Sequence, residues 1–185
     1  MPETAYNNGF DDAAGGYIEV QHDHIAYRYE ILKRLGKGKF ARRSTTVNCS
    51  YDQLSAISSH LGSSAGSFGQ VLCVYDHKRK TKLALKVIRN KTQFHNQSRT
   101  EINILRYLKA ADKHDRFNFI QMKSYFLFRN HVCITFELLT MNLYHYLKET
   151  NLVGCSEALV RRFTYSIVKS LCALSELRVI HCDLK

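Results

Sequence analysis

A glycine-bearing turn followed by two apolar strands contains the residues that point first to chemistry. The stretch Gly66–Lys86 begins with the turn, continues through an apolar strand at 71–75 and, after a charged turn, reaches Lys86 on a second apolar strand. Glycine lets backbone N–H groups approach an anion closely because it has no Cβ, and a neighbouring lysine supplies a positive charge. The stretch therefore fits a hairpin that covers a nucleotide triphosphate. It fits an ordinary hairpin with a solvated lysine equally well.

Charge and composition place the chain among globular proteins that could bind a polyanion. The 185 residues are 45% hydrophobic and carry a formal net charge of +11. Residues 1–23 contain no Lys or Arg, so the remainder is more basic still and favours a nucleotide, an acidic protein or a nucleic acid. A solvated basic surface is the alternative. Neither a secretory signal nor the roughly 18 apolar residues of a membrane-spanning helix occurs, and we expect no membrane partner.

The cysteines are scattered, without a C-x-x-C pair, and most fall inside apolar patterns. They favour buried, reduced thiols over disulfides or zinc ligands, which predicts a cytoplasmic or nuclear location. The six positions are Cys49, Cys73, Cys133, Cys155, Cys172 and Cys182.

Hydrophobic periodicity predicts a small sheet lobe followed by a helical one. The first predicted element is an extended segment at 1–28, anchored by aromatic residues such as Tyr27 and Tyr29. Strands follow at 29–35 and 71–75, and a third strand contains Lys86 and ends at residue 88. After them come a helix at 97–110, strands at 119–128 and 131–136, and a short helix at 143–148. A last helix, capped by Ser156, carries the strongest helical signal. Its apolar positions are Leu159, Val160, Phe163, Ile167, Leu171, Leu174 and Leu177.

Residues 39–66 interrupt this pattern. They are rich in serine, show no periodicity and are longer than loops inside compact domains usually are. Removing these 28 residues joins Gly36-Lys37-Gly38 to Ser67 and gives G-K-G-S-F-G-Q-V, a complete G-x-G-x-x-G-x-V loop. We therefore predict that residues 39–66 are inserted into a glycine-rich loop, either as a real variant or as translated intervening sequence. The alternative first strand, 57–61, has the poorer apolar pattern.

Three groups of residues resemble landmarks of eukaryotic protein kinases, in the same order: Ala84-Leu85-Lys86, Glu101, and His181-Cys182-Asp183-Leu184-Lys185. The last resembles the H-R-D-L-K catalytic loop with cysteine in place of arginine. This H-C-D-L-K version is similar to the dual-specificity tyrosine-regulated (DYRK) kinases. So is Phe136-Glu137-Leu138-Leu139, and residues 8–30 look like the homology box of the class II branch of that family.

The resemblance implies an α+β, protein-kinase-like fold. It would comprise a complete small sheet lobe with one helix, plus the first helices of the large lobe. Residues 1–28 would form the homology box, 29–139 the small lobe and hinge with the insertion at 39–66, and 140–185 the start of the large lobe.

The resemblance also assigns roles to matching positions. Lys86 would contact the α- and β-phosphates of ATP and pair with Glu101, while Asp183 would orient the substrate hydroxyl and Lys185 would stabilise the transferring phosphoryl group. The remaining ATP-binding residues would be Gly36, Gly38, Ser67, Phe68 and Gly69 in the glycine loop, Val71 and Ala84 at the adenine, Phe136 at the back of the pocket, and Glu137 and Leu139 at the hinge. Taken alone, Glu101 would read as a solvated helix carboxylate and Asp183 as a loop cap.

The implied activity is ATP-dependent phosphorylation of Ser/Thr in protein substrates, with Tyr autophosphorylation, and the implied cofactors are ATP and Mg²⁺. No residue here is assigned to the metal, because the catalytic-loop Asn and the D-F-G Asp of the family would follow Lys185. We therefore expect these 185 residues to be a fragment that is inactive by itself and that is poorly folded, prone to aggregation or bound by chaperones. A truncated product that acts only through binding is the alternative, and a nucleic-acid-binding module is the least favoured reading.

Overall fold

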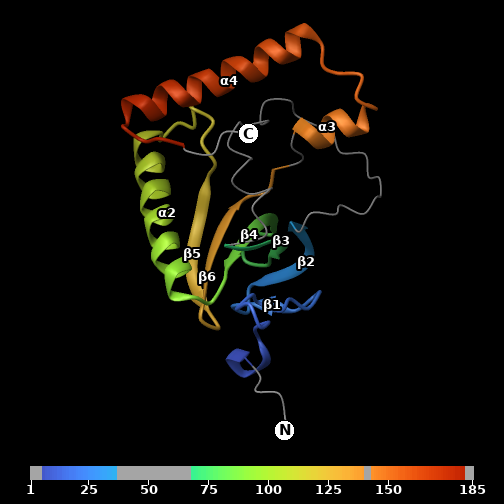
Figure 1. The fold of residues 1–185 in the computed structure, drawn as a ribbon, viewed down its shortest axis with the longest axis vertical. Coiled ribbons are helices and arrows are strands. Elements are labelled where there is room, and N and C mark those ends of the chain that lie inside the picture. Colours follow the sequence, from blue (N-terminus) through green and yellow to red (C-terminus); the bar gives the residue numbers. More distant parts are fainter. Residues whose placement is uncertain (1–5, 37–67, 140–142, 182–185) are drawn as a thin grey trace.

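A curled antiparallel sheet organises the chain in the computed structural model, which describes residues 6–36, 68–139 and 143–181 (Figure 1). The strands are β1 (His24–Ile25), β2 (Tyr29–Gly36), β3 (Gly69–Asp76), β4 (Thr81–Ile88), β5 (Met122–Phe128) and β6 (His131–Glu137), in the order β1-β2-β3-β4-β6-β5. The helices are a short 3-10 helix, η1 (Tyr6–Gly9), and α2 (Thr92–Ala111), α3 (Leu143–Glu149) and α4 (Glu157–Glu176). This confirms the α+β, kinase-like fold class; the division into domains stays a prediction.

The alternation of side chains along β4 assigns the two faces of the sheet. Leu83, Leu85 and Val87 enter one buried cluster, which the N-terminal segment completes with residues such as Tyr17. Ala84, one residue out of phase, enters a second cluster on the opposite face. Helix α2 contributes Ile102 to this second cluster and lies beside β5 (Figure 1). Lys86 has the parity of Ala84 and therefore faces the α2 side.

Buried polar contacts attach the N-terminal segment to the sheet. The Asp11 carboxylate lies 2.7 Å from Nε2 of His131, and both side chains are almost completely buried. Farther along, the Arg28 guanidinium donates two hydrogen bonds, of 2.7 and 2.6 Å, to the buried carboxylate of Asp76. The described residues 6–28 thus lie against the sheet, as expected for the extended segment predicted at 1–28. The prediction for Tyr27 is wrong: its ring is 98% exposed, because the turn between β1 and β2 directs it outward.

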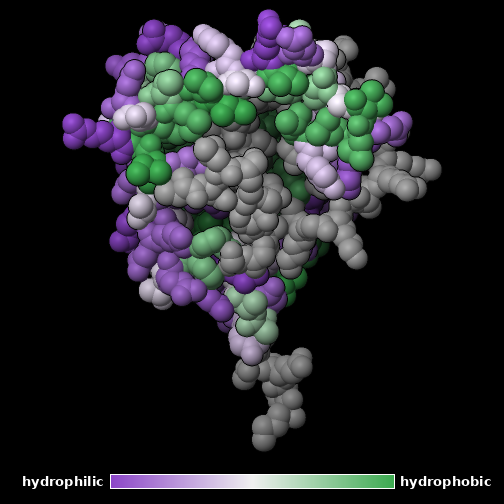
Figure 2. Space-filling model, turned by 45° about the horizontal axis from the view of Figure 1, so that its top comes forward, coloured by the Kyte–Doolittle hydropathy of each residue, from purple (hydrophilic) through white to green (hydrophobic). Residues whose placement is uncertain are grey.

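The C-terminal part of α4 packs against the end of α2. Leu108 of α2 and Leu174 of α4 share a third cluster with Phe119, and Ser156 caps α4 by accepting a hydrogen bond from the Leu159 N–H, as predicted. The rest of the predicted apolar face of α4 is less covered, and Val160 is 49% exposed. Figure 2 shows green apolar surface in the upper part of the molecule, where α3 and α4 lie.

Several helices and strands begin or end at other residues than predicted, each for a local reason. Helix α2 begins at Thr92 instead of residue 97, because the only large apolar residue of its first turns is Phe94, and one residue shows no helical period. Residues 119–121 are not in a strand, although Phe119 and Ile120 are buried, and β5 begins at Met122. A bulge after Ile31 breaks the alternation that would have placed Lys33 inside. Residues 57–61 lie outside the described chain, and β2 pairs with β3 as predicted for the original strand.

The thiols differ in their burial. Cys73 and Cys133 are buried and free, as predicted, and burial raises the pKa of the Cys133 thiol to about 12. Cys155 is only half-buried, and Cys172 lies exposed on α4, so the expectation of buried thiols is wrong there. Among the described residues, no helix has the length and apolar character needed to span a membrane.

Candidate nucleotide-binding site

The centre of the candidate site is an ion pair between the sheet and α2. The Lys86 ammonium lies 2.7 Å from Oε1 and 2.8 Å from Oε2 of Glu101. The two side chains are 13% and 24% exposed, so the pair is largely shielded and still open on one side. The sequence predicted this pair, and the structure forms it.

Strand and helix geometry explain why the two charges meet. On β4, Lys86 is paired with Val71 of β3 on one side and Ile134 of β6 on the other, which fixes the origin of its side chain. On α2, the residue after Glu101 is Ile102, whose side chain is buried in the cluster that contains Val71 and Ile134. Burial of Ile102 therefore orients α2 so that the neighbouring carboxylate faces the sheet.

An apolar surface adjoins the ion pair. Val71, Ala84 and Phe136 are buried in the second cluster, and Leu139 packs against it from the segment that follows β6. Ala84 and Phe136 are direct cross-strand partners, so their side chains lie on the same face at neighbouring positions. The four residues predicted to contact or border an adenine ring thus lie in one apolar cluster next to Lys86.

Glu137, a predicted hinge residue, has a structural role that the sequence did not indicate. Its Oε1 accepts a hydrogen bond of 3.0 Å from the Gln121 N–H, and its own N–H donates to the Gln121 carbonyl at 3.3 Å. These two bonds fix the start of the segment between β6 and α3.

The described parts of the glycine loop are its two ends. Gly36 ends β2 and is paired with Val71, and Gly69 begins β3. A Cβ at Gly69 would lie 2.2 Å from the Val87 carbonyl oxygen, so only glycine allows the two backbones to approach this closely. The Phe68 ring packs edge-on against Phe94 of α2, with centroids 5.4 Å apart.

The other predicted site residues lie outside the described chain. They are Gly38 and Ser67 in the glycine loop, and Asp183 and Lys185 in the H-C-D-L-K motif. Their assignments stay predictions.

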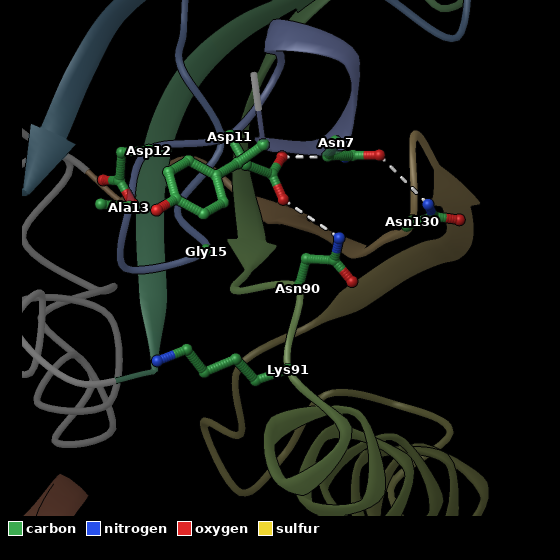
Figure 3. A pocket seen from close by; sticks show the side chains of 9 residues that line it. Asn7, Asp11, Asp12, Ala13, Gly15, Asn90, Lys91 and Asn130 are labelled. Atoms are coloured by element: carbon green, nitrogen blue, oxygen red, sulfur yellow. Dashed lines mark hydrogen bonds between the residues drawn. The ribbon is translucent and has the colours of Figure 1, made fainter. Parts of the chain in front are cut away.

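A polar cavity of about 380 Å³ lies away from these residues, between the N-terminal segment and the loop that precedes α2 (Figure 3). Asp11 forms part of its lining and accepts hydrogen bonds from Asn7 at 2.9 Å and Asn90 at 3.0 Å. None of the predicted nucleotide-binding residues that the structure describes lines it. No sequence pattern indicated this cavity, because its residues come from distant parts of the chain.

Comparison with known proteins agrees with this geometry. The family described as "Protein kinase domain" matches residues 55–185. The chain is 45% identical over 184 residues to human dual specificity tyrosine-phosphorylation-regulated kinase 4, covering 100% of this chain and 30% of that protein. It is 46% identical over 179 residues to kinase 3 of Macaca fascicularis, covering 97% and 27%, and 45% identical over 181 residues to kinase mbk-2 of Caenorhabditis elegans, covering 98% and 19%.

The sheet, the helix α2 and the Lys86–Glu101 pair are those of the small lobe of a protein kinase, and the chain belongs to the protein kinase family. Within that family it belongs to the dual-specificity tyrosine-regulated (DYRK) kinases. The chain spans less than a third of the length of these relatives. The family match begins at residue 55, inside the segment 39–66 that we predict to be inserted, while β2 lies before that segment.

Proposed function

We propose that this chain provides the ATP-binding lobe and catalytic loop of a DYRK-family kinase that phosphorylates Ser/Thr in protein substrates and Tyr on itself. The Lys86–Glu101 pair carries the proposal. The ammonium group, held by one carboxylate, supplies the positive charge that binds a nucleotide phosphate. The adjoining apolar surface suits the adenine of the same nucleotide.

Different residues of this chain would bind the phosphates, bind the adenine and orient the substrate hydroxyl. Glu101 orients the Lys86 ammonium, which supplies positive charge to the α- and β-phosphates. Val71, Ala84 and Phe136 would exclude water from the adenine and fix its plane. In the H-C-D-L-K motif, Asp183 would orient the substrate hydroxyl and accept its proton.

Magnesium would neutralise phosphate charge in the reaction of a complete kinase. The 185 residues contain no D-F-G sequence, and we assign none of them to the metal. We therefore propose that the isolated polypeptide binds nucleotide but does not transfer its phosphate. It would act only through binding.

Nucleotide binding is tested with a fluorescent ATP analogue and the variant Lys86→Met. Lysine 86 is expected to contribute a charge-assisted contact of about 1.5–3 kcal/mol, which corresponds to at least a tenfold loss of affinity. Lys123→Met is the matched control, because Lys123 is an exposed lysine on the edge strand β5. Equal affinity of the Lys86→Met variant and the parent would refute nucleotide binding at this site.

Turnover is tested separately, by phosphate transfer from Mg·ATP to a protein substrate. We expect none from the 185-residue chain. If the chain transfers phosphate and Asp183→Asn abolishes this transfer, the proposed inactivity is refuted and the kinase assignment is unaffected.

Partners and location complete the proposal: protein substrates for the whole kinase, chaperones for the isolated 185 residues, and a cytoplasmic or nuclear site of action. The half-exposed Val160 and Val168 on α4 support chaperone binding, since chaperones bind exposed apolar surface. The test is whether a chaperone co-purifies with the parent chain. Variants with polar residues at positions 160 and 168 should lose that chaperone.

A further inference from the structure

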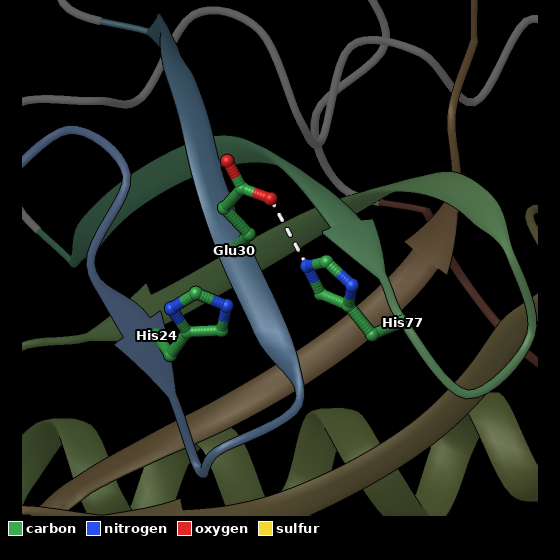
Figure 4. Close-up of side chains that lie close together, drawn as sticks. All are labelled: His24, Glu30 and His77. Carbon is green, nitrogen blue, oxygen red and sulfur yellow. Dashed lines mark hydrogen bonds and ion pairs between the residues drawn. The ribbon is translucent and has the colours of Figure 1, made fainter.

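Three imidazoles surround one carboxylate at the β1 end of the sheet, remote in the fold from Lys86 and Glu101. Glu30 lies on β2, His24 on β1 and His77 just after β3 (Figure 4). His22, which precedes β1, contacts the same carboxylate. We propose that His24, Glu30 and His77 form a binding site for Zn²⁺.

The distances suit a small divalent ion. One ligand atom from each of His24, Glu30 and His77 lies within 4.8 Å of the others. A tetrahedral Zn²⁺ with bonds of about 2.0–2.2 Å holds its ligand atoms about 3.3–3.5 Å apart. Movement of each side chain by about 1 Å therefore closes the site. Figure 4 shows the His24 and His77 rings near one another, with Glu30 directed toward His77.

His22 reaches the same carboxylate from the other side. Its Nδ1 lies 2.8 Å from Oε1 of Glu30, while Nε2 of His77 lies 3.0 Å from Oε2. The carboxylate is therefore already shared between two imidazoles, and the His24 ring lies with its centroid 5.2 Å from that of His77. The His22 and His77 side chains are 66% and 48% exposed, so an ion can enter directly from solvent.

The backbone that carries these ligands is fixed by hydrogen bonds. His24 and Glu30 are direct cross-strand partners in the β1–β2 ladder. The His77 N–H donates to the Arg28 carbonyl at 3.1 Å, and the His22 N–H donates to the Ile31 carbonyl at 2.8 Å. Three ligands on ordered backbone need only small side-chain movements to bind, which keeps the entropic cost of binding low.

The donor set selects the metal. Imidazole nitrogens with one carboxylate oxygen suit zinc and its transition-metal neighbours, whereas magnesium and calcium require oxygen ligands. A bound ion would connect β1 to β2 and β3. It would thus fasten the N-terminal segment to the sheet at a further place, in addition to the Asp11–His131 and Arg28–Asp76 contacts.

The test is a Zn²⁺ titration of the tag-free 185-residue chain by isothermal calorimetry, repeated with Co²⁺ and read by visible absorption. We expect one equivalent to bind, with a Co²⁺ spectrum typical of four nitrogen and oxygen ligands. His24→Ala and His77→Ala are each expected to weaken binding about tenfold or more, since losing even a second-shell partner costs about 10–100-fold. Glu30→Gln should also weaken binding, and it preserves the side-chain shape.

His114→Ala is the matched control, because His114 is an exposed histidine in the turn after α2. Its affinity should equal that of the parent. Circular dichroism verifies that each variant keeps the parent fold, which should be unchanged because the three histidines are exposed and Glu30→Gln preserves the shape of a half-buried side chain. The proposal is overturned if the parent chain shows no saturable binding. It is overturned equally if the His24 and His77 variants bind like the parent, or if the Co²⁺ spectrum shows thiolate ligation.

Discussion

Replacing Asp11 by alanine should destabilise the fold more than any exposed substitution in the N-terminal segment. The carboxylate accepts a hydrogen bond of 2.7 Å from His131, one from Asn7 and one from Asn90. Its side chain is 3% exposed and that of His131 is 0% exposed. Nδ1 of His131 also lies 2.7 Å from the Ile88 carbonyl, so both ring nitrogens face acceptor oxygens.

The expected cost follows from this burial. Removing one partner of a buried, hydrogen-bonded pair leaves the other partner without compensation and costs about 3–5 kcal/mol. A domain of this size is typically stable by about 5–15 kcal/mol. We therefore expect Asp11→Ala to remove a large share of the stability, measured by urea unfolding. Far-UV circular dichroism is the suitable probe, because the chain contains no Trp.

A double variant distinguishes the interaction energy of Asp11 and His131 from the separate destabilising effect of each substitution. Substituting both Asp11→Ala and His131→Leu removes both polar partners, and buried pairs replaced by apolar groups cost far less than broken ones. The two substitutions should therefore be non-additive, with a coupling of about 1–3 kcal/mol. Glu149→Ala, an exposed carboxylate at the end of α3, is the control and should stay within about 0.5 kcal/mol of the parent. A loss below about 1 kcal/mol for Asp11→Ala, or strict additivity, would refute the reasoning.

Three further results are expected. Gly69→Ala should destabilise the chain by about 1–3 kcal/mol in urea unfolding, because its Cβ would meet a β4 backbone oxygen that cannot rotate away. Hydrogen bonds from Arg28 lower the pKa of Asp76, so this carboxylate stabilises the fold above its ordinary pKa of about 4 and stops doing so as the pH falls through its lowered native pKa. Asp76→Asn should therefore be less stable than the parent at pH 7, and the difference should shrink in unfolding experiments below about pH 4. Leu174→Ala, in the cluster that joins α4 to α2, should cost about 2–5 kcal/mol and expose α4 to limited proteolysis, whereas the half-exposed Val168→Ala should change neither noticeably.

The sequence predicted the parts of the fold that follow from local pattern and from short motifs. The apolar runs at 71–75 and 131–136 located β3 and β6, two interior strands of the sheet, and the position of Lys86 on a strand with Glu101 on the next helix predicted the ion pair that the structure forms. These predictions succeed because a strand that is buried on both faces is apolar along most of its length, and because the pair needs one residue from each element.

The contacts that hold the N-terminal segment against the sheet could not be predicted. Asp11 and His131 are 120 residues apart, and a carboxylate in a polar stretch gives no sign that it will be buried. The start of β5 was misplaced for a related reason. Phe119 and Ile120 are as apolar as strand residues, but they are buried beside α2 in a loop that the Asp112 side chain holds by accepting hydrogen bonds from the Arg116 and Phe117 N–H groups. Tertiary contacts decide these cases, and the local pattern does not record them.

The pairing of Gly36 with Val71 has a consequence for how this gene can change length. The two strands that flank residues 37–68 are held in register by their own ladder, whatever joins them. For a flexible loop, each doubling of length costs only about 0.6 kcal/mol, so extending a loop of four residues to 32 costs about 2 kcal/mol. Extra sequence gained at this position therefore costs the sheet no more than a typical destabilising point substitution, about 0.5–3 kcal/mol. Natural selection would act on it mainly through what the longer loop does to a bound nucleotide.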